Sequence, residues 1–350
     1  MAIDRDQLAA QHDHHGMAKV IEGTPSQIEF ALTDPDFPDL PEGGFDEVVV
    51  VGMGGSSLPV DVLTDAFSNQ LRAPVRVCRH YEIPSRVNAR TLVVASSFSG
   101  NTEETLAPLQ DPGGLPPHVV VMTAGGQLAE VAQERGYPLI SIPKDREPDG
   151  FQPRCATGYF VTYMARLLAG VGVMSEDSLQ TVDGSVTFLR NLDVRSEAEA
   201  AAEWIGERIA LIYTDQIHEG SVGRITKIKL NEHAKRPAFF NALPEANHNE
   251  TIGMSRPFGQ YALLYMKDPA SHSRVHQRFD VMRSVFADTG LDHVSFREWE
   301  MPGETNFQKI FAALTFGDWC SYTVALLDGI DPTPVQLVED FKKALEGVGS

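Results

Sequence analysis

The chain has 350 residues, of which 42% are hydrophobic, and its formal net charge is −19 at pH 7. This length predicts two α/β domains that share an interface. So negative a chain is not expected to bind nucleic acid or anionic membranes, although a local positive site for a phosphate can exist within it. The cysteines at 78, 155 and 320 lie far apart without zinc-ligand spacing, which predicts buried thiols in a reducing compartment.

Residues 1–45 are predicted to form a helical arm that ends in a proline-rich stretch. Its histidines at 12, 14 and 15 surround Asp13, but a polar terminal segment usually stays solvated, and we predict no metal site there. The first residues lack the basic and apolar parts of a secretion signal, and we find no run of 18 apolar residues. We therefore expect a cytoplasmic protein without a membrane span.

Residues 46–150 alternate strand and helix in the pattern of a complete doubly wound domain. The first predicted strand is a run of valines, which is typical of a parallel strand buried on both faces. The five predicted strands are residues 48–51, 75–78, 91–95, 119–122 and 139–142.

Residues 151–350 repeat this pattern in outline. After a charged loop, two helices with apolar stripes are predicted at 158–170 and 197–209. The strands expected next are 210–213, 261–265 and 294–296, with a helix at 274–288, and two helices at 307–327 and 335–345 close the segment. The sequence thus predicts two similar domains.

Two loops rich in glycine and hydroxyl side chains follow the first and third predicted strands. The first is Gly52-Met53-Gly54-Gly55-Ser56-Ser57, and the second is Ser96-Ser97-Phe98-Ser99-Gly100-Asn101-Thr102. Glycine lets backbone N–H groups approach an anion without a Cβ in the way, and each loop opens a helix whose positive end faces the same point. In a doubly wound sheet both loops lie at the topological switch point. Either loop alone could be a capped turn, but together they predict a phosphate site.

The loops match neither of two common nucleotide-binding motifs. No Gly-Lys-Ser/Thr of a P-loop follows them. The first loop also lacks the third glycine of a dinucleotide fingerprint, because Ser57 stands there, and no acidic residue follows the next strand until Glu82.

Carboxylates, histidines and amides are dense between Asn231 and Asn249. Flanking prolines make this segment poor helix or core material, so we expect it to line a cleft. Taken singly, a residue such as Glu232 is more often a helix-surface acid, and one such as His248 is more often a turn residue. Beside a sugar-phosphate site they suit proton transfer between adjacent carbons of a hydroxy-aldehyde or ketone, which needs a carboxylate base, a proton shuttle and a cation for the enediolate. Glu245 is the second candidate for the base.

Together with Gln152-Pro153-Arg154, Gly317-Asp318-Trp319 and Asp331-Pro332-Thr333-Pro334, these motifs resemble in order and spacing the bifunctional phosphoglucose/phosphomannose isomerases. That family is built from two sugar isomerase (SIS) domains. The resemblance implies an α/β fold of two SIS-type doubly wound, flavodoxin-like parallel-sheet domains. Their expected limits are an N-terminal helical arm at 1–45, a phosphate-binding domain at 46–150, and a second domain with C-terminal helices at 151–350.

The resemblance also implies an activity and an assembly. The chain would interconvert glucose 6-phosphate, and mannose 6-phosphate, with fructose 6-phosphate through a cis-enediol. It would be a homodimer whose active site is completed by the neighbouring subunit. No cofactor or metal is expected, since an arginine and a lysine are available for the enediolate.

Site residues follow from the same resemblance. Glu232 would be the base, Arg154 would steady the enediolate, and His248 would assist ring opening across the dimer. The phosphate would be bound at Gly54, Gly55, Ser56, Ser97, Ser99 and Thr102, the sugar would be reached by Lys342 or else Lys343, and Thr333 would leave room for the C2 epimer.

The chain departs from the family pattern at Ser57-Leu58-Pro59 and within 214–224, which bears on substrate preference. One alternative is a non-catalytic SIS protein that senses a sugar phosphate, which would have no use for Glu232 or Arg154. An amidotransferase-type sugar synthase is a weaker alternative, because no glutaminase domain with a cysteine nucleophile precedes the SIS region.

Overall fold

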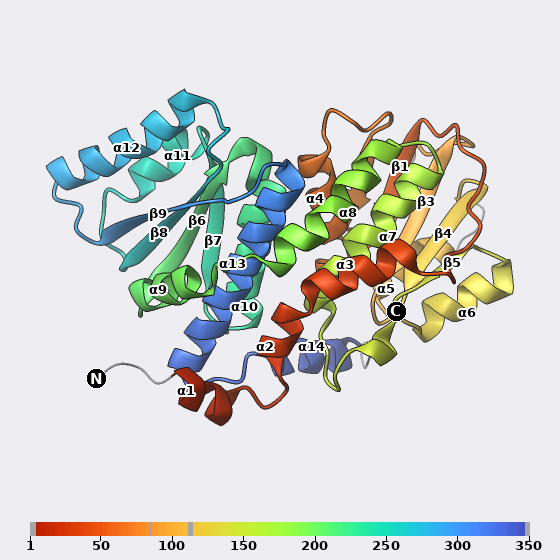
Figure 1. The fold of residues 1–350 in the computed structure, drawn as a ribbon, viewed down its shortest axis with the longest axis horizontal. Helices are drawn as coiled ribbons and strands as arrows, with labels where there is room; N and C mark the ends of the chain where they lie inside the picture. The colour runs from red at the N-terminus through yellow and green to blue at the C-terminus, as the bar shows by residue number, and fades with distance from the viewer. Residues whose placement is uncertain (1–4, 84–85, 111–114, 347–350) are drawn as a thin grey trace.

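Two parallel sheets lie side by side, each with helices on both faces (Figure 1). The computed structural model describes residues 5–83, 86–110 and 115–346. The first sheet has the strand order β2-β1-β3-β4-β5, and every neighbouring pair is parallel. This is the flavodoxin-like order, and all five predicted strands are confirmed. Their bounds are β1 Glu47–Val51, β2 Val75–Cys78, β3 Thr91–Ser97, β4 His118–Thr123 and β5 Leu139–Ser141.

Alternating valines of the first sheet contribute to two separate cores. Val48 and Val50 pack into a large core shared with the second sheet, whereas Val49 and Val51 pack into a smaller core on the opposite face. Because successive side chains of a strand point to opposite faces, a run of valines is what a doubly covered strand requires.

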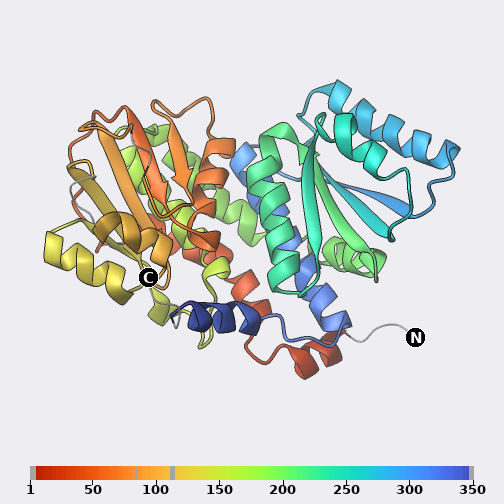
Figure 2. The same ribbon diagram turned by 180° about the vertical axis from the view of Figure 1, so that it is seen from behind.

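The helices that cover the first sheet come from several parts of the chain (Figures 1 and 2). The helical arm consists of α1 Arg5–His12, α2 Met17–Glu22 and α3 Thr24–Thr33, and the predicted domain contributes α4 Leu58–Ala66, α5 Glu103–Gln110 and α6 Gly126–Arg135. Helix α7, Thr157–Gly170, packs against both α3 and α4. Helices on either side of residues 46–150 therefore cover this sheet, and the domain limits stay predictions.

The second sheet has the order β7-β6-β8-β9 and is also parallel throughout. Three of its strands were predicted, but β7 was missed because its segment was expected to be irregular and to line a cleft. It pairs with β6 on one side only and lies at the sheet edge, where the side chain of Phe239 is 54% exposed. The strands are β6 Ile209–Asp215, β7 Ala238–Leu243, β8 Tyr261–Lys267 and β9 Val294–Glu300.

Four helices of the second half differ from the sequence prediction. Helices α10, Arg224–Glu232, and α11, Ala246–Gly253, were not predicted, and they occupy both ends of the segment between Asn231 and Asn249 that was wrongly expected to be poor helix material. Helix α8, Glu176–Arg190, was not predicted, and α9, Arg195–Ile205, ends four residues early because Gly206 follows it and Ile209 begins β6. The remaining helices are α12 Ser273–Asp288, α13 Asn306–Leu327 and α14 Gln336–Glu346.

Helix α13 lies centrally and packs against α8, α9 and α10. Its length and its mean hydropathy of 1.4 would allow it to cross a membrane. However, 83% of its most apolar 18-residue stretch is buried inside the protein. A core helix surrounded by other elements is expected to be apolar all round.

Candidate active site

The two glycine- and hydroxyl-rich loops meet where β1 and β3 end. These strands are neighbours, with Val51 opposite Ala95, and the strand order reverses between them. The hydroxyl of Ser96 donates to the carbonyl oxygen of Ser56 at 2.8 Å, and the N–H of Phe98 donates to Ser56 Oγ at 2.9 Å. The predicted convergence of the loops at the switch point is therefore confirmed, and Ser56 joins them.

Two glycines of the first loop allow close contacts within the protein, and a third leaves the backbone open to solvent. A Cβ on Gly52 would lie 2.7 Å from the Ser96 carbonyl oxygen, and one on Gly55 would lie 3.1 Å from Pro153 O and from the Arg154 backbone. Gly54 has a φ of +50°, a left-handed value that favours glycine, and is exposed, with nothing near its Cβ position. Gly54 is thus the position where an anion can approach the backbone.

The hydroxyls of the second loop are held by local hydrogen bonds. Ser97 Oγ lies 2.9 Å from Thr102 Oγ1 and accepts from the N–H of Gly100 at 3.2 Å. Ser99 is exposed, and its Oγ accepts from the N–H of Asn101 at 3.3 Å. Helix α5 begins directly after Thr102, so its N-terminal end lies beside these hydroxyls.

Arg79 is a cation at this loop that the sequence analysis missed. It follows β2 directly, and β2 lies beside β1. Arg79 Nε donates to Ser57 Oγ at 3.2 Å, and its Nη2 donates to Asp61 Oδ2 at 2.9 Å. Its place at the end of a strand next to the glycine loop is the sequence signal that could have found it.

Arg154 and Glu232 lie side by side although 78 positions separate them in the chain. Arg154 Nη1 is 3.3 Å from Glu232 Oε2, and the Arg154 residue is 2% exposed whereas the Glu232 side chain is 34% exposed. Arg154 Nη2 donates to the carbonyl oxygens of Pro332 at 2.9 Å and Thr333 at 2.8 Å. A buried, fully oriented guanidinium thus faces a carboxylate that solvent and ligands can reach.

Lys229 fixes the backbone of Arg154 from one turn earlier in α10 than Glu232. Its ammonium group donates to the Arg154 carbonyl oxygen at 2.8 Å and pairs with Asp318 at 2.8 Å. Lys229 is only 3% exposed, and a buried ammonium group requires such partners. Asp318 belongs to the Gly317-Asp318-Trp319 motif, and its carboxylate holds this lysine in place.

Lys235 is a further cation near the pair. Its backbone has a left-handed φ of 55°, and its ammonium group donates to the carbonyl oxygens of His233 at 3.0 Å and Asp331 at 2.8 Å. Partial burial and the charge of Arg154 lower the pKa of Lys235 to about 8. Burial and the neighbouring cations also lower the pKa of His233 well below its usual value, so this histidine is neutral.

Thr333 and the lysines of the last helix stand in different surroundings. Thr333 lies against Arg154 and is 4% exposed, and its Oγ1 has no partner among the described residues. Lys342 lies on the exposed helix α14, where its ammonium group pairs with Glu339 at 2.8 Å, and Lys343 is exposed as well. The roles predicted for these residues stay predictions.

His248 lies away from Glu232 in the same chain. Glu232 ends α10 before β7, whereas His248 is exposed on α11 after β7. The six residues of β7 span about 20 Å at the usual rise of a strand. One chain therefore brings together the two loops, Arg154, Glu232 and Thr333, but not His248.

The second sheet has its own switch point, where β6 and β8 end. There Asp215, His218 and Asp268 are buried with ligand atoms within 4.8 Å of one another, a spacing that could hold a metal ion. Lys309 Nζ, however, lies 2.7 Å from Asp268 Oδ1 and already supplies a cation. Although burial opposes it, hydrogen bonds from His218 and Lys309 hold the pKa of Asp268 well below its ordinary value, as an ion-pair network requires.

The fold and the loops at the first switch point define a SIS-domain protein of the two-sheet type. Residues 194–345 match the model of the bacterial phospho-glucose isomerase C-terminal SIS domain. The C-terminal domain of glucosamine-fructose-6-phosphate aminotransferase from Francisella tularensis has the same fold. Its TM-score is 0.69 at 13% identity, over 92% of this chain and 98% of that one.

Similarity to two relatives shows which kind of SIS-domain protein this chain is. The bifunctional phosphoglucose/phosphomannose isomerase of Caldicellulosiruptor bescii is 31% identical over 86% of this chain and 89% of its own length. The D-glucosamine-6-phosphate 4-epimerase of Sulfolobus acidocaldarius is 35% identical, but over 59% of this chain and 63% of its own length. The chain belongs to the bifunctional phosphoglucose/phosphomannose isomerase family.

Proposed function

We propose that this chain interconverts glucose 6-phosphate and mannose 6-phosphate with fructose 6-phosphate by moving a proton between C1 and C2. Membership of the isomerase family supports this reaction. The observation that carries it is the contact of 3.3 Å between Arg154 and Glu232. A protein that only senses a sugar phosphate would not need a reachable carboxylate beside a buried guanidinium.

In the proposed mechanism Glu232 removes the C2 proton of the open-chain aldose and returns it to C1. A second proton moves from the C2 hydroxyl to the C1 oxygen, so the product is the ketose. Arg154 stabilises the negative charge that develops on the enediolate, and its hydrogen bonds to Pro332 and Thr333 keep it oriented before the reaction. General-base catalysis of this kind contributes about 10²–10⁴-fold to the rate.

The substrate would lie with its phosphate on the two loops and its C1–C2 end at Glu232. Gly55 supports this placement, because its Cβ position is only 3.1 Å from the Arg154 backbone, so the phosphate loop adjoins the cation. The buried Thr333 Oγ1 and Arg154 Nε lack partners among the described residues, and substrate oxygens would supply them.

The assembly and setting are part of the same proposal. The chain would act as a cytoplasmic homodimer in sugar-phosphate metabolism such as glycolysis, with neither nucleic acid nor membrane as partner. The partner's His248 would open the sugar ring, Lys342 would reach the sugar, and Thr333 would leave room for either epimer at C2. The exposure of His248, and its distance from Glu232 within one chain, support a role in another subunit's site.

Isomerase assays of purified protein test this function. Wild type should form fructose 6-phosphate from both aldose phosphates, and Glu232→Gln should lose about 10²–10⁴-fold in kcat. The amide keeps the size and polarity of the side chain, so sugar-phosphate affinity should stay near wild type.

Proton exchange and a second substrate separate the alternatives. In D₂O, wild type should incorporate deuterium at C2 of the aldose phosphate, and Glu232→Gln should not. Binding without turnover in wild type would indicate the sensor. Conversion of glucosamine 6-phosphate at C4, with neither aldose isomerised, would indicate the activity named for the Sulfolobus relative. Retained isomerisation by Glu232→Gln would move the base elsewhere, first to Glu245.

A further inference from the structure

Lys235 adopts a backbone conformation that glycine usually supplies. It lies in the turn between α10 and β7, with a φ of 55°. Among the residues that the structure describes, it is the only one other than glycine with a positive φ. Glycine is the usual residue in a left-handed turn after a helix, because it has no Cβ. Backbone outliers of this kind concentrate at functional sites, so the Lys235 side chain is expected to make contacts that glycine cannot make.

The ammonium group of Lys235 connects the end of α10 with a segment far along the chain. It donates to the carbonyl oxygen of His233 at 3.0 Å and to that of Asp331 at 2.8 Å. His233 directly follows the proposed base Glu232, and a cation is favourable at a helix C-terminus, where carbonyl groups lack partners within the helix. One side chain therefore holds the backbone beside the base and the backbone at Asp331.

Residues 331–333 form the segment that orients Arg154. Two of its carbonyl oxygens accept from Arg154 Nη2 at 2.9 and 2.8 Å. Within the segment, the N–H of Thr333 donates to the Asp331 carboxylate at 2.9 Å, and His15 of the helical arm contacts the same carboxylate at 2.8 Å. A fixed Asp331 therefore also fixes the acceptors that hold the guanidinium.

We propose that Lys235 is a positioning residue that holds the base and the cation of the isomerase reaction in one arrangement. Arg154 and Glu232 contact each other through side chains whose supports come from distant parts of the chain. Lys235 ties these supports together, because it bonds to backbone on both sides. A displacement of about 1 Å at a catalytic group can cost about 100-fold in rate. The role in catalysis rests on the proposed function.

Arg236 provides a matched comparison in the same turn. Its guanidinium pairs with Asp328, directly after α13, and so also connects the end of α10 with the C-terminal part of the chain. Asp328 lies before residues 331–333, so this pair supports the turn without bonding to the segment that orients Arg154. Loss of either cation removes one positive charge and one connection across the turn, but only loss of Lys235 releases Asp331.

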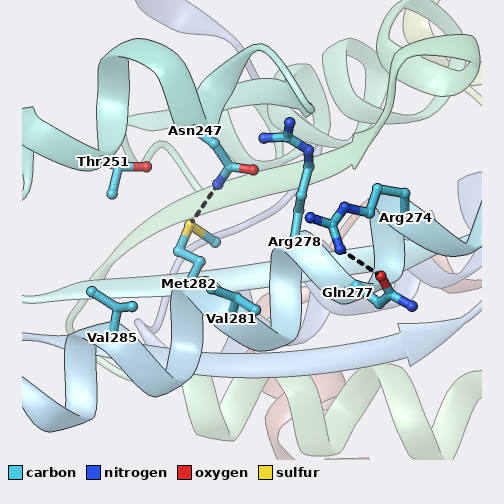
Figure 3. Close-up of a pocket in the computed structure, with 8 residues that line it drawn as sticks. All are labelled: Asn247, Thr251, Arg274, Gln277, Arg278, Val281, Met282 and Val285. Carbon is cyan, nitrogen blue, oxygen red and sulfur yellow. Dashed lines mark hydrogen bonds between the residues drawn. The ribbon is translucent and has the colours of Figure 1, made fainter.

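Substitutions at Lys235 should leave the face that carries His248 unchanged. A groove lies there between α11 and α12, and the residues that line it all belong to these two helices (Figure 3). Lys235 lies in the turn before β7, and its ammonium group bonds to His233 and Asp331. A loss of kcat in Lys235 variants would therefore reflect the arrangement of Arg154 and Glu232 rather than ring opening.

Steady-state kinetics of the full-length chain with fructose 6-phosphate test the proposal. Lys235→Met keeps an unbranched side chain without its donors. It should lower kcat about 10- to 100-fold and leave KM within about twofold, because the phosphate-binding loops are untouched. Lys235→Gly relieves the left-handed turn, so it should melt at least as high as Lys235→Met and still be as slow. Arg236→Gln should keep kcat within about twofold of wild type, since Asp331 stays bound.

Hydrogen exchange without substrate tests the same connection independently of turnover. Amides in residues 331–336 should exchange at least about tenfold faster in Lys235→Met than in wild type. The reason is that local opening of the segment then breaks one hydrogen bond fewer to a charged group.

Each outcome bears on one proposal. Wild-type kcat in Lys235→Met or Lys235→Gly would overturn the positioning role, and so would a raised KM at unchanged kcat. An equal loss of kcat in Arg236→Gln, or unchanged exchange of residues 331–336, would overturn it as well. If exchange rises as expected but wild type isomerises no hexose phosphate, the connection through Lys235 stands and the proposed function fails.

Discussion

Arg154 joins three segments of the chain at the candidate site. Its guanidinium reaches Glu232 on α10 and the carbonyl oxygens of Pro332 and Thr333, while its own carbonyl oxygen accepts from Lys229. Losing one partner of a buried charge is costly, so this network fixes the arginine more firmly than a single surface ion pair would. The planar fork of arginine suits these divergent acceptors, and lysine would not replace it.

Asp65 makes the contact between the two halves sensitive to pH. It lies on α4 of the first half, and its Oδ2 accepts from the N–H of Ser221 in the second half at 2.9 Å. Burial raises the pKa of Asp65 to about 6, against hydrogen bonds from Ser221 and the charge of His218 that lower it. The folded protein therefore binds this proton more tightly than the unfolded chain does.

We expect wild type to lose stability relative to Asp65→Asn as pH rises from about 4 to about 7. The unfolded carboxyl ionises near 3.8 and the folded one near 6, so ionisation disfavours folding within this window. The full effect is up to about 3 kcal/mol. Urea unfolding of both proteins at several pH values measures it, and asparagine keeps an acceptor for Ser221. If the difference in unfolding free energy between wild type and Asp65→Asn does not change with pH, the raised pKa of Asp65 is contradicted.

At the scale of elements, the first sheet could be predicted because its central strands β1, β3 and β4 are buried on both faces, so their sequences are largely apolar. Strand β7 could not, since it is an edge strand between two prolines with the exposed Phe239 in it. The loops at the switch point carried a signal in their glycines and hydroxyls. The carbonyl oxygens that orient Arg154 carried none, because any residue supplies a carbonyl.

The second loop leads to a prediction about substrate binding. Ser97→Ala and Thr102→Ala should each raise KM for fructose 6-phosphate with little change in kcat, because a hydroxyl that binds phosphate contacts ground and transition states equally. A hydrogen bond to a charged group contributes about 1.5–3 kcal/mol, which corresponds to roughly 10- to 100-fold in KM. Thr64→Ala is a control, since its hydroxyl donates to carbonyl oxygens within α4. An unchanged KM in both loop variants would remove the phosphate assignment.

At the scale of the whole molecule, one chain contains most of a site and the exposed groups that a second chain would use. Glu232 and Arg154 lie together, whereas His248 and the apolar side chains of Leu337 and Phe341 on α14 are exposed to solvent. The family resemblance predicted the shared site.

The shared site predicts complementation between two inactive variants. Glu232→Gln and His248→Ala should each be inactive, but after subunit exchange a mixed dimer has one site with intact Glu232 and an intact partner histidine, while its other site has neither. At random exchange about half of the dimers are mixed, and each has one working site of two, so activity should reach roughly a quarter of wild type. Native mass spectrometry would establish the exchange independently of activity. If mixed dimers form and the mixture stays inactive, both residues act within one chain and the shared-site model is wrong.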